Sequence, residues 1–197
     1  MNLPNSLTLT RIFLVPLLVV VLLTKFVGRQ ILGIPTEVVG AGIFGLASLT
    51  DWADGYLARR RKQVTPLGQV IDPLADKLLT SAALISLVQM GMAPAWMVAV
   101  IIGREFAVTG LRSLAYARGV VIAASPLGKI KMVVEVVAIL ALILGHDRSG
   151  SLYLIGQVAL WLVVAAALVS AADYFRRFNT ILAPRLIDIE TPRKKVS

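Results

Sequence analysis

The chain contains no cysteine and only one histidine, His146, among its 197 residues. The lack of cysteine excludes disulfide bonds, thiolate metal sites and a cysteine nucleophile, and a single histidine cannot form an imidazole metal cluster. A metal ion held by this chain must therefore have oxygen ligands. Such ligands favour hard cations such as Mg²⁺ or Mn²⁺, bound by carboxylates.

Charged residues are also scarce, at 16% of the chain, whereas 57% is hydrophobic and the mean hydropathy is +0.82. Soluble domains contain about 25% charged residues, so this composition indicates a membrane protein. Each crossing of a ~30 Å hydrocarbon core takes about 20 residues, so the length suits about six spanning helices and no second folded domain. The net charge of +9 lies mostly beside apolar runs, which favours anionic lipid headgroups as partners and not nucleic acid.

Apolar segments separated by turn-forming residues predict an all-α protein with six transmembrane helices. We expect these helices at about 7–27, 35–58, 70–91, 94–117, 126–146 and 150–175. Residues 1–182 would form one transmembrane domain, and residues 183–197 a basic cytoplasmic tail without apolar periodicity. Lysine and arginine gather after the second helix, around the connection after the fourth, and in the tail. Because basic loops stay in the cytoplasm, both termini are expected there.

Four aspartates flank the connection between the second and third expected helices, with Asp51 and Asp54 before it and Asp72 and Asp76 after it. Spacings of three and four residues place each pair on one helix face. Antiparallel helices would bring all four carboxylates to a similar depth. These anions repel one another and need protons, basic partners or bound cations to neutralise them. A solvated helix end, with the acids paired to the basic residues of the connection, is the structural alternative.

The pattern that contains these aspartates resembles the signature of the CDP-alcohol phosphotransferase family at all eight defining positions, over 26 residues. These positions are Asp51, Asp54, Gly55, Ala58, Arg59, Gly68, Asp72 and Asp76. The wider resemblance covers nearly the whole chain. It implies a membrane enzyme that transfers a phosphatidyl group from a CDP-linked lipid to a small alcohol.

In that family the aspartates bind two metal ions, so the resemblance implies two Mg²⁺ or Mn²⁺ ions per active site. Asp51 and Asp72 would bridge both ions, Asp54 would complete the first site and Asp76 the second. Asp76 would also be the catalytic general base that takes the proton of the acceptor hydroxyl. Two metal ions a few Å apart can clamp the attacking and leaving oxygens of a phosphoryl transfer.

Other positions of the family pattern would contact the CDP-lipid. Within or beside the signature these are Gly55, Ala58, Arg59, Thr65 and Gly68. The N-terminal segment 4–11 resembles the family's opening segment, where Asn5, Thr8 and Arg11 would face the same site. A cap at the helix start is the alternative role for a hydroxyl residue such as Thr8.

The fourth expected helix carries Arg104 and Glu105. Ionisable groups inside membrane helices pair with one another or line a site, so pairing within the bundle is one interpretation. The other follows from the segments 103–105, 111–112 and 128–131, which resemble the bacterial phosphatidylglycerophosphate synthases and imply a glycerol 3-phosphate acceptor. Its phosphate would be bound by Arg104, Arg112, Arg118, Lys129 and Lys131. Met132 and Glu135 depart from that subfamily, which commonly has Thr and Gln there.

The resemblance therefore predicts transfer from CDP-diacylglycerol to sn-glycerol 3-phosphate, giving phosphatidylglycerophosphate and CMP. The enzyme would be a homodimer in the inner (cytoplasmic) membrane, with its active site towards the cytoplasm. Inositol phosphate, phosphatidylglycerol and serine are alternative acceptors for the same chemistry. A divalent cation transporter is the alternative of another class, although transporters place polar groups at the midplane and often contain inverted repeats.

Overall fold

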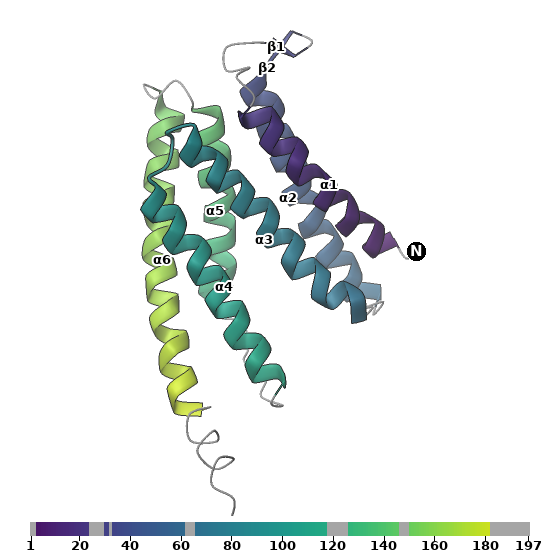
Figure 1. The fold of residues 1–197 in the computed structure, drawn as a ribbon, viewed down its shortest axis with the longest axis vertical. Coiled ribbons are helices and arrows are strands. Elements are labelled where there is room, and N and C mark those ends of the chain that lie inside the picture. The colour runs from purple at the N-terminus through teal and green to yellow at the C-terminus, as the bar shows by residue number, and fades with distance from the viewer. Residues whose placement is uncertain are drawn as a thin grey trace, which may run out of the picture.

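The computed structural model describes residues 3–23, 30–31, 33–61, 66–117, 126–145 and 150–181 of the chain. Six helices account for nearly all of this part and confirm the expected all-α fold (Figure 1). They are α1 (Leu3–Leu23), α2 (Thr36–Arg61), α3 (Pro66–Gln89), α4 (Ala95–Ala117), α5 (Pro126–Leu144) and α6 (Ser151–Ile181).

A small antiparallel sheet between α1 and α2 was not predicted from the sequence. Its strands are β1 (Gln30–Ile31) and β2 (Ile34–Pro35), with Ile31 paired to Ile34. Gly33 in the turn has a φ of 82°, a left-handed conformation that glycine adopts without steric cost. Strands of two residues are too short to show an alternating apolar pattern, so only a break in the helices was expected here.

The turn between α3 and α4 lies at Gly91, where the sequence predicts a break between helices. Gly91 has a φ of 70°, and its N–H donates to the Val88 oxygen at 2.9 Å. The Met92 N–H donates to the Leu87 oxygen at 2.8 Å. Together these two bonds form a Schellman motif, which satisfies the last carbonyls of the helix. Leu87 and Met92 are both buried, so an apolar contact accompanies the cap.

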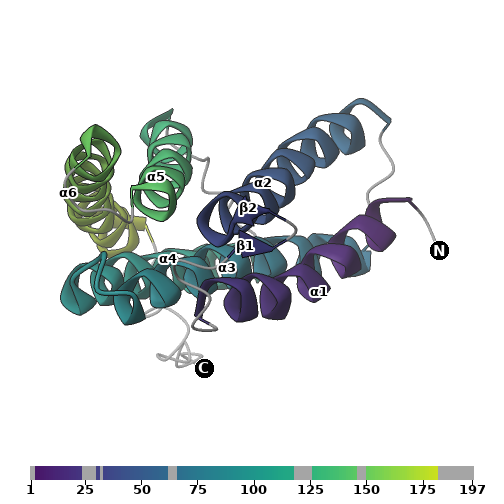
Figure 2. The same cartoon turned by 90° about the horizontal axis from the view of Figure 1, so that it is seen from above.

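Two groups of helices pack together to form the bundle (Figure 2). Helix α1 packs against α2 and α3, while α6 packs against α4 and α5, and α2 contacts α5. The buried core draws on every helix, with fully buried side chains such as Leu18, Phe44, Leu87, Ile101 and Leu142. Many large apolar side chains of α6 are exposed instead, as expected for a surface that faces lipid.

In the described part of the chain, one helical segment is both long enough and apolar enough to span a membrane, namely Ser151–Asp173 of α6. Shorter apolar segments lie in three other helices, at Ile12–Leu23, Thr36–Thr50 and Lys77–Gln89. Charged side chains interrupt the apolar runs of α4 and α5, at Arg104 and Glu105 and at Lys131 and Glu135. The six helices are therefore as predicted, while the six crossings stay a prediction.

Candidate active site

The four aspartates of the expected metal site lie on two consecutive helices, Asp51 and Asp54 on α2 and Asp72 and Asp76 on α3. These helices contact each other and run in opposite directions from their connection (Figure 1). Asp51 and Asp76 are each ten residues from the connected end of their helix, or about 15 Å along its axis. The helix bounds thus give the matched depth that the spacing predicted, although the aspartate side chains lie outside the described residues.

The expected CDP-lipid contacts come from these two helices and from α1. Gly55, Ala58 and Arg59 are on α2, Gly68 is on α3, and Asn5, Thr8 and Arg11 are on α1. Helix α1 packs against both α2 and α3, and its N-terminal end lies at the same end of the molecule as their connection (Figures 1 and 2). The fold therefore brings these segments together. Their side chains are outside the described part, as is Thr65 altogether.

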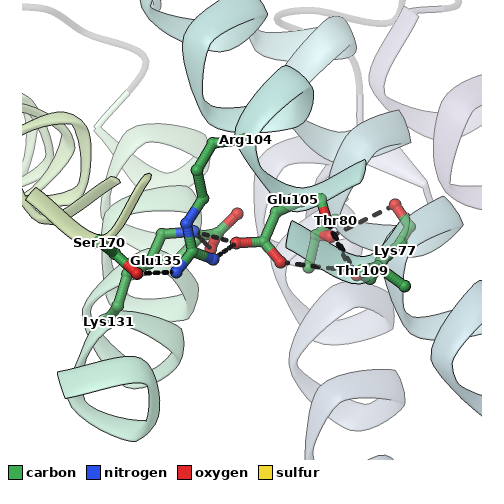
Figure 3. Close-up of polar contacts among 8 residues, drawn as sticks. All are labelled: Lys77, Thr80, Arg104, Glu105, Thr109, Lys131, Glu135 and Ser170. Carbon is green, nitrogen blue, oxygen red and sulfur yellow. Dashed lines mark hydrogen bonds and ion pairs between the residues drawn. The ribbon is translucent and has the colours of Figure 1, made fainter. Parts of the chain in front are cut away.

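A cluster of charged side chains joins α3, α4, α5 and α6, with Glu105 of α4 at its centre (Figure 3). Glu105 Oε1 accepts hydrogen bonds from Arg104 Nη1, at 2.5 Å, and from Lys131 Nζ. Glu105 Oε2 lies 3.5 Å from Lys77 Nζ. One carboxylate is thus shared by three cations, which come from three helices.

Two further residues complete this cluster. Lys131, whose side chain is only 3% exposed, also lies 3.4 Å from Glu135 Oε2, one helical turn along α5. Arg104 Nη2 donates to the hydroxyl of Ser170 on α6. Three cations and two carboxylates give the cluster a formal charge of +1. Charges removed from water need such pairing, because an isolated buried charge is very costly.

The expected acceptor-binding residues fall into two groups. Arg104 and Lys131 are both paired with Glu105 inside the cluster, and pairing within the bundle was one of the two interpretations given for Arg104 and Glu105. Arg112 is exposed on α4, two turns beyond Glu105. The Lys129 side chain, on α5, and the whole of Arg118 lie outside the described residues. The structure thus brings two of the five residues together.

Thr109 also belongs to the cluster, because its hydroxyl oxygen accepts a hydrogen bond from Lys77 Nζ. Sequence reasoning did not predict a role in such a cluster for Lys77, Thr109, Glu135 or Ser170. A signal existed for Thr109 and Glu135, which follow Glu105 and Lys131 by four residues and so share their helix faces. For Lys77 and Ser170 the partners lie on other helices, and no local spacing indicates such a contact.

The chemistry of a metal site depends on the four aspartates. Among the side chains that the structure describes, no group of three or more acidic or histidine residues is placed to hold a metal ion. The aspartates are not among those side chains. Their carboxylate oxygens fit hard divalent cations, and they form two pairs, Asp51 with Asp76 and Asp54 with Asp72, at similar distances from the helix connection.

Comparison with known proteins agrees with the family that the aspartate pattern resembles. The family model of the CDP-alcohol phosphatidyltransferases matches residues 1–170. A CDP-diacylglycerol–glycerol-3-phosphate 3-phosphatidyltransferase of Bacillus subtilis is 49% identical over 183 residues, which cover 89% of this chain and 94% of the relative. A protein of the same name from Rickettsia felis is 36% identical over 177 residues, with the same coverage of the two chains. The chain therefore belongs to the CDP-alcohol phosphatidyltransferase family and is a transferase.

Proposed function

We propose that this protein transfers the phosphatidyl group of CDP-diacylglycerol to sn-glycerol 3-phosphate, forming phosphatidylglycerophosphate and CMP. The observation that carries this proposal is the high identity to a relative of that name along 94% of its length. The complete aspartate pattern on the α2–α3 hairpin supports the same reaction.

The four aspartates would hold two Mg²⁺ or Mn²⁺ ions, since the family generally depends on divalent metal. Asp51 and Asp72 would bridge both ions, while Asp54 and Asp76 would each complete one site. When bound, the ions would polarise the diphosphate and neutralise its charge. Two pairs of carboxylates from antiparallel helices, each pair at a similar depth, can surround two such ions.

Asp76 would act as the general base. It would accept the proton of the acceptor hydroxyl as that oxygen bonds to the phosphorus of the phosphatidyl group. The bond from this phosphorus to the bridging oxygen of the diphosphate breaks, and CMP leaves with that oxygen. A positioned carboxylate in such a role contributes typically 10²- to 10⁴-fold to the rate.

The nucleotide end of the CDP-lipid would lie between α1, α2 and α3. Asn5, Thr8, Arg11, Arg59 and Thr65 would supply polar contacts. Gly55, Ala58 and Gly68 would let the ligand approach the helix backbones closely, because they have small side chains or none.

The phosphate of the acceptor would be bound by cations of α4 and α5. Arg112 is exposed, and with Lys129 and Arg118 it would make the main contacts. Arg104 and Lys131 already share Glu105, so they would reach the phosphate only by exchanging that carboxylate for it. Arg104 keeps one buried donor, its Nε–H, that has no hydrogen-bond partner among the described residues.

The enzyme would be a homodimer that crosses the inner (cytoplasmic) membrane six times, with residues 1–182 as its catalytic domain. The active site and both termini, including the basic tail 183–197, would face the cytoplasm. The exposed apolar side chains of α6 support membrane insertion. The orientation follows from the basic residues near the helix ends.

A panel of acceptors tests the proposal. Purified protein is incubated with CDP-diacylglycerol, Mg²⁺ or Mn²⁺, and either glycerol 3-phosphate, inositol phosphate, phosphatidylglycerol or serine, and the products are resolved by mass. We expect phosphatidylglycerophosphate to form fastest, with CMP in equal amount. Faster reaction of another acceptor would overturn the assignment, and an absence of CMP with every acceptor would exclude the transferase chemistry.

A further inference from the structure

Lys77 follows Asp76 directly on α3, and its largely buried side chain reaches α4 (Figure 3). Its Nζ donates to the main-chain oxygen of Glu105 at 3.0 Å and to the hydroxyl oxygen of Thr109, and lies 3.5 Å from Glu105 Oε2. The Thr109 hydroxyl donates its own hydrogen to the Glu105 main-chain oxygen at 2.8 Å, so its lone pairs are open to Lys77. An ammonium group has three N–H donors, and α4 supplies three acceptors.

The acceptors of Lys77 are themselves held in place. The Glu105 carboxylate is fixed from α5 by Lys131, and from its own helix by Arg104. Arg104 in turn donates to Ser170 of α6. Lys77 is therefore connected, through one carboxylate, to a frame made of three other helices.

The contact between Lys77 and Glu105 is far from the turn that connects their helices. Lys77 precedes the end of α3 at Gln89 by twelve residues, and Glu105 follows the start of α4 at Ala95 by ten. At 1.5 Å per residue, the contact is about 15 to 18 Å from either helix end. At that distance the turn constrains the sliding and rotation of α3 against α4 only weakly, and the polar contact adds a constraint there.

We infer that Lys77 is a positioning residue for Asp76, an inference that rests on the proposed role of Asp76 as general base. Adjacent residues of a helix are separated by about 1.5 Å along the axis and about 100° around it. A side chain fixed to α4 at position 77 therefore sets the height and rotation of the backbone at Asp76. Misplacing a reacting group by about 1 Å can cost about 10²-fold in rate.

A role for Lys77 as a direct substrate contact is the competing explanation, and kinetics separate the two. Removal of a side chain that binds a substrate raises the KM of that substrate. A misplaced base lowers kcat and leaves both KM values nearly unchanged. Removal of a purely structural contact lowers the stability of the protein and does not change kcat selectively over KM.

Lys77→Met tests the inference, because it keeps the length of the side chain and removes all three donors. It is measured in the wild-type protein and in Asp76→Asn, which cannot accept a proton. In the wild-type background we expect kcat to fall roughly 10- to 100-fold, with both KM values within about twofold. In the Asp76→Asn background we expect little further loss, because no base is left to misplace.

Thr109→Val and Gln157→Leu complete the experiment. Thr109→Val removes one acceptor of Lys77 and should show the same pattern with a smaller loss of kcat. This variant tests the inference even if Lys77→Met does not fold. Gln157→Leu is the matched control, since it removes a 2.6 Å hydrogen bond from α6 to the Met92 oxygen, in the turn at the far end of α4. It should lower thermal stability and leave kcat unchanged.

Three outcomes would overturn the inference. They are an equal proportional loss in the wild-type and Asp76→Asn backgrounds, a rise confined to one KM, or an unchanged kcat in Lys77→Met and Thr109→Val. If the wild-type protein still converts glycerol 3-phosphate in these cases, only the inference fails and the proposed function stands. If the wild-type protein releases no CMP, the proposed function fails, and the inference fails with it.

Discussion

The ammonium group of Lys131 on α5 is paired with the Glu105 carboxylate on α4 at a place where only 3% of the lysine side chain is exposed. Glu105 is also paired with Arg104 and Lys77, so a single carboxylate contacts cations from α3, α4 and α5. Removing that acid leaves several charges without their partner in the interior of the bundle.

We therefore expect Glu105→Gln to be among the most destabilising conservative changes in the chain. Breaking a buried ion pair by removing one partner costs about 3 to 5 kcal/mol, and partial exposure of Glu105 favours the lower value. Glu135→Gln is the matched control, because Glu135 contacts Lys131 at 3.4 Å and leaves Glu105 in place. Thermal unfolding in detergent should rank wild type above Glu135→Gln and Glu135→Gln above Glu105→Gln. The reverse order would show that Glu105 is not the centre of the cluster.

A second prediction concerns the proposed metal ligands. Asp72→Asn removes a carboxylate that would bridge both ions, so activity should fall to near background and divalent-ion binding should weaken. The fold should tolerate the change, because one of four mutually repelling charges is removed. Titration of Mn²⁺ by calorimetry, together with a CMP-release assay, checks both effects. Asp72→Asn protein with near wild-type activity and unchanged metal dependence would contradict the two-metal proposal.

The third prediction concerns the acceptor phosphate. Arg112 is exposed on α4 and an arginine can hold a phosphate with two parallel hydrogen bonds. Arg112→Ala should raise the KM for glycerol 3-phosphate by the equivalent of about 1.5 to 3 kcal/mol, the value for a charged hydrogen bond. The KM for CDP-diacylglycerol should change little.

Lys129→Ala should behave in the same way as Arg112→Ala if both residues contact the phosphate. Steady-state kinetics with each substrate varied in turn provide the measurement. Equal losses for both substrates would indicate that these cations only anchor helix ends to lipid headgroups.

The fourth prediction tests the packing of α5 on α6. A Cβ atom built on Gly156 would lie 2.7 Å from Leu142 Cγ and 3.0 Å from the Leu142 main-chain nitrogen. Gly156→Ala should therefore destabilise the protein by about 1 to 3 kcal/mol, the usual cost of overpacking. Gly42→Ala is the control, since nothing lies within 4 Å of its Cβ position. A melting temperature of Gly156→Ala equal to that of Gly42→Ala would contradict the close approach of these helices.

The sequence predicted those parts of the fold that depend on local chemistry. Apolar segments and the turn at Gly91 were sufficient to predict six helices and the end of α3. Equal spacing about one connection was sufficient to predict the common depth of Asp51 and Asp76. These features need only helix periodicity and the positions of glycine and proline.

Features that depend on contacts between distant segments were not predicted. Glu105 is unusual in the sequence as an acid within an apolar helix, but its partners on α3 and α5 are 28 and 26 residues away in the chain. The periodicity of a helix does not indicate which cation on another helix pairs with a buried carboxylate. The hairpin of β1 and β2 was missed for a different reason, because two-residue strands carry no pattern.

The most direct test of the proposed function measures how much glycerol 3-phosphate is incorporated into lipid. Radiolabelled glycerol 3-phosphate is incubated with purified protein in CDP-diacylglycerol micelles containing Mg²⁺ or Mn²⁺, and the label in the organic phase is compared with the CMP released. We expect equal amounts of the two products, and we expect EDTA or Asp51→Asn to abolish both. CMP release without labelled lipid, or labelled lipid formed equally well by Asp51→Asn, would contradict the proposal.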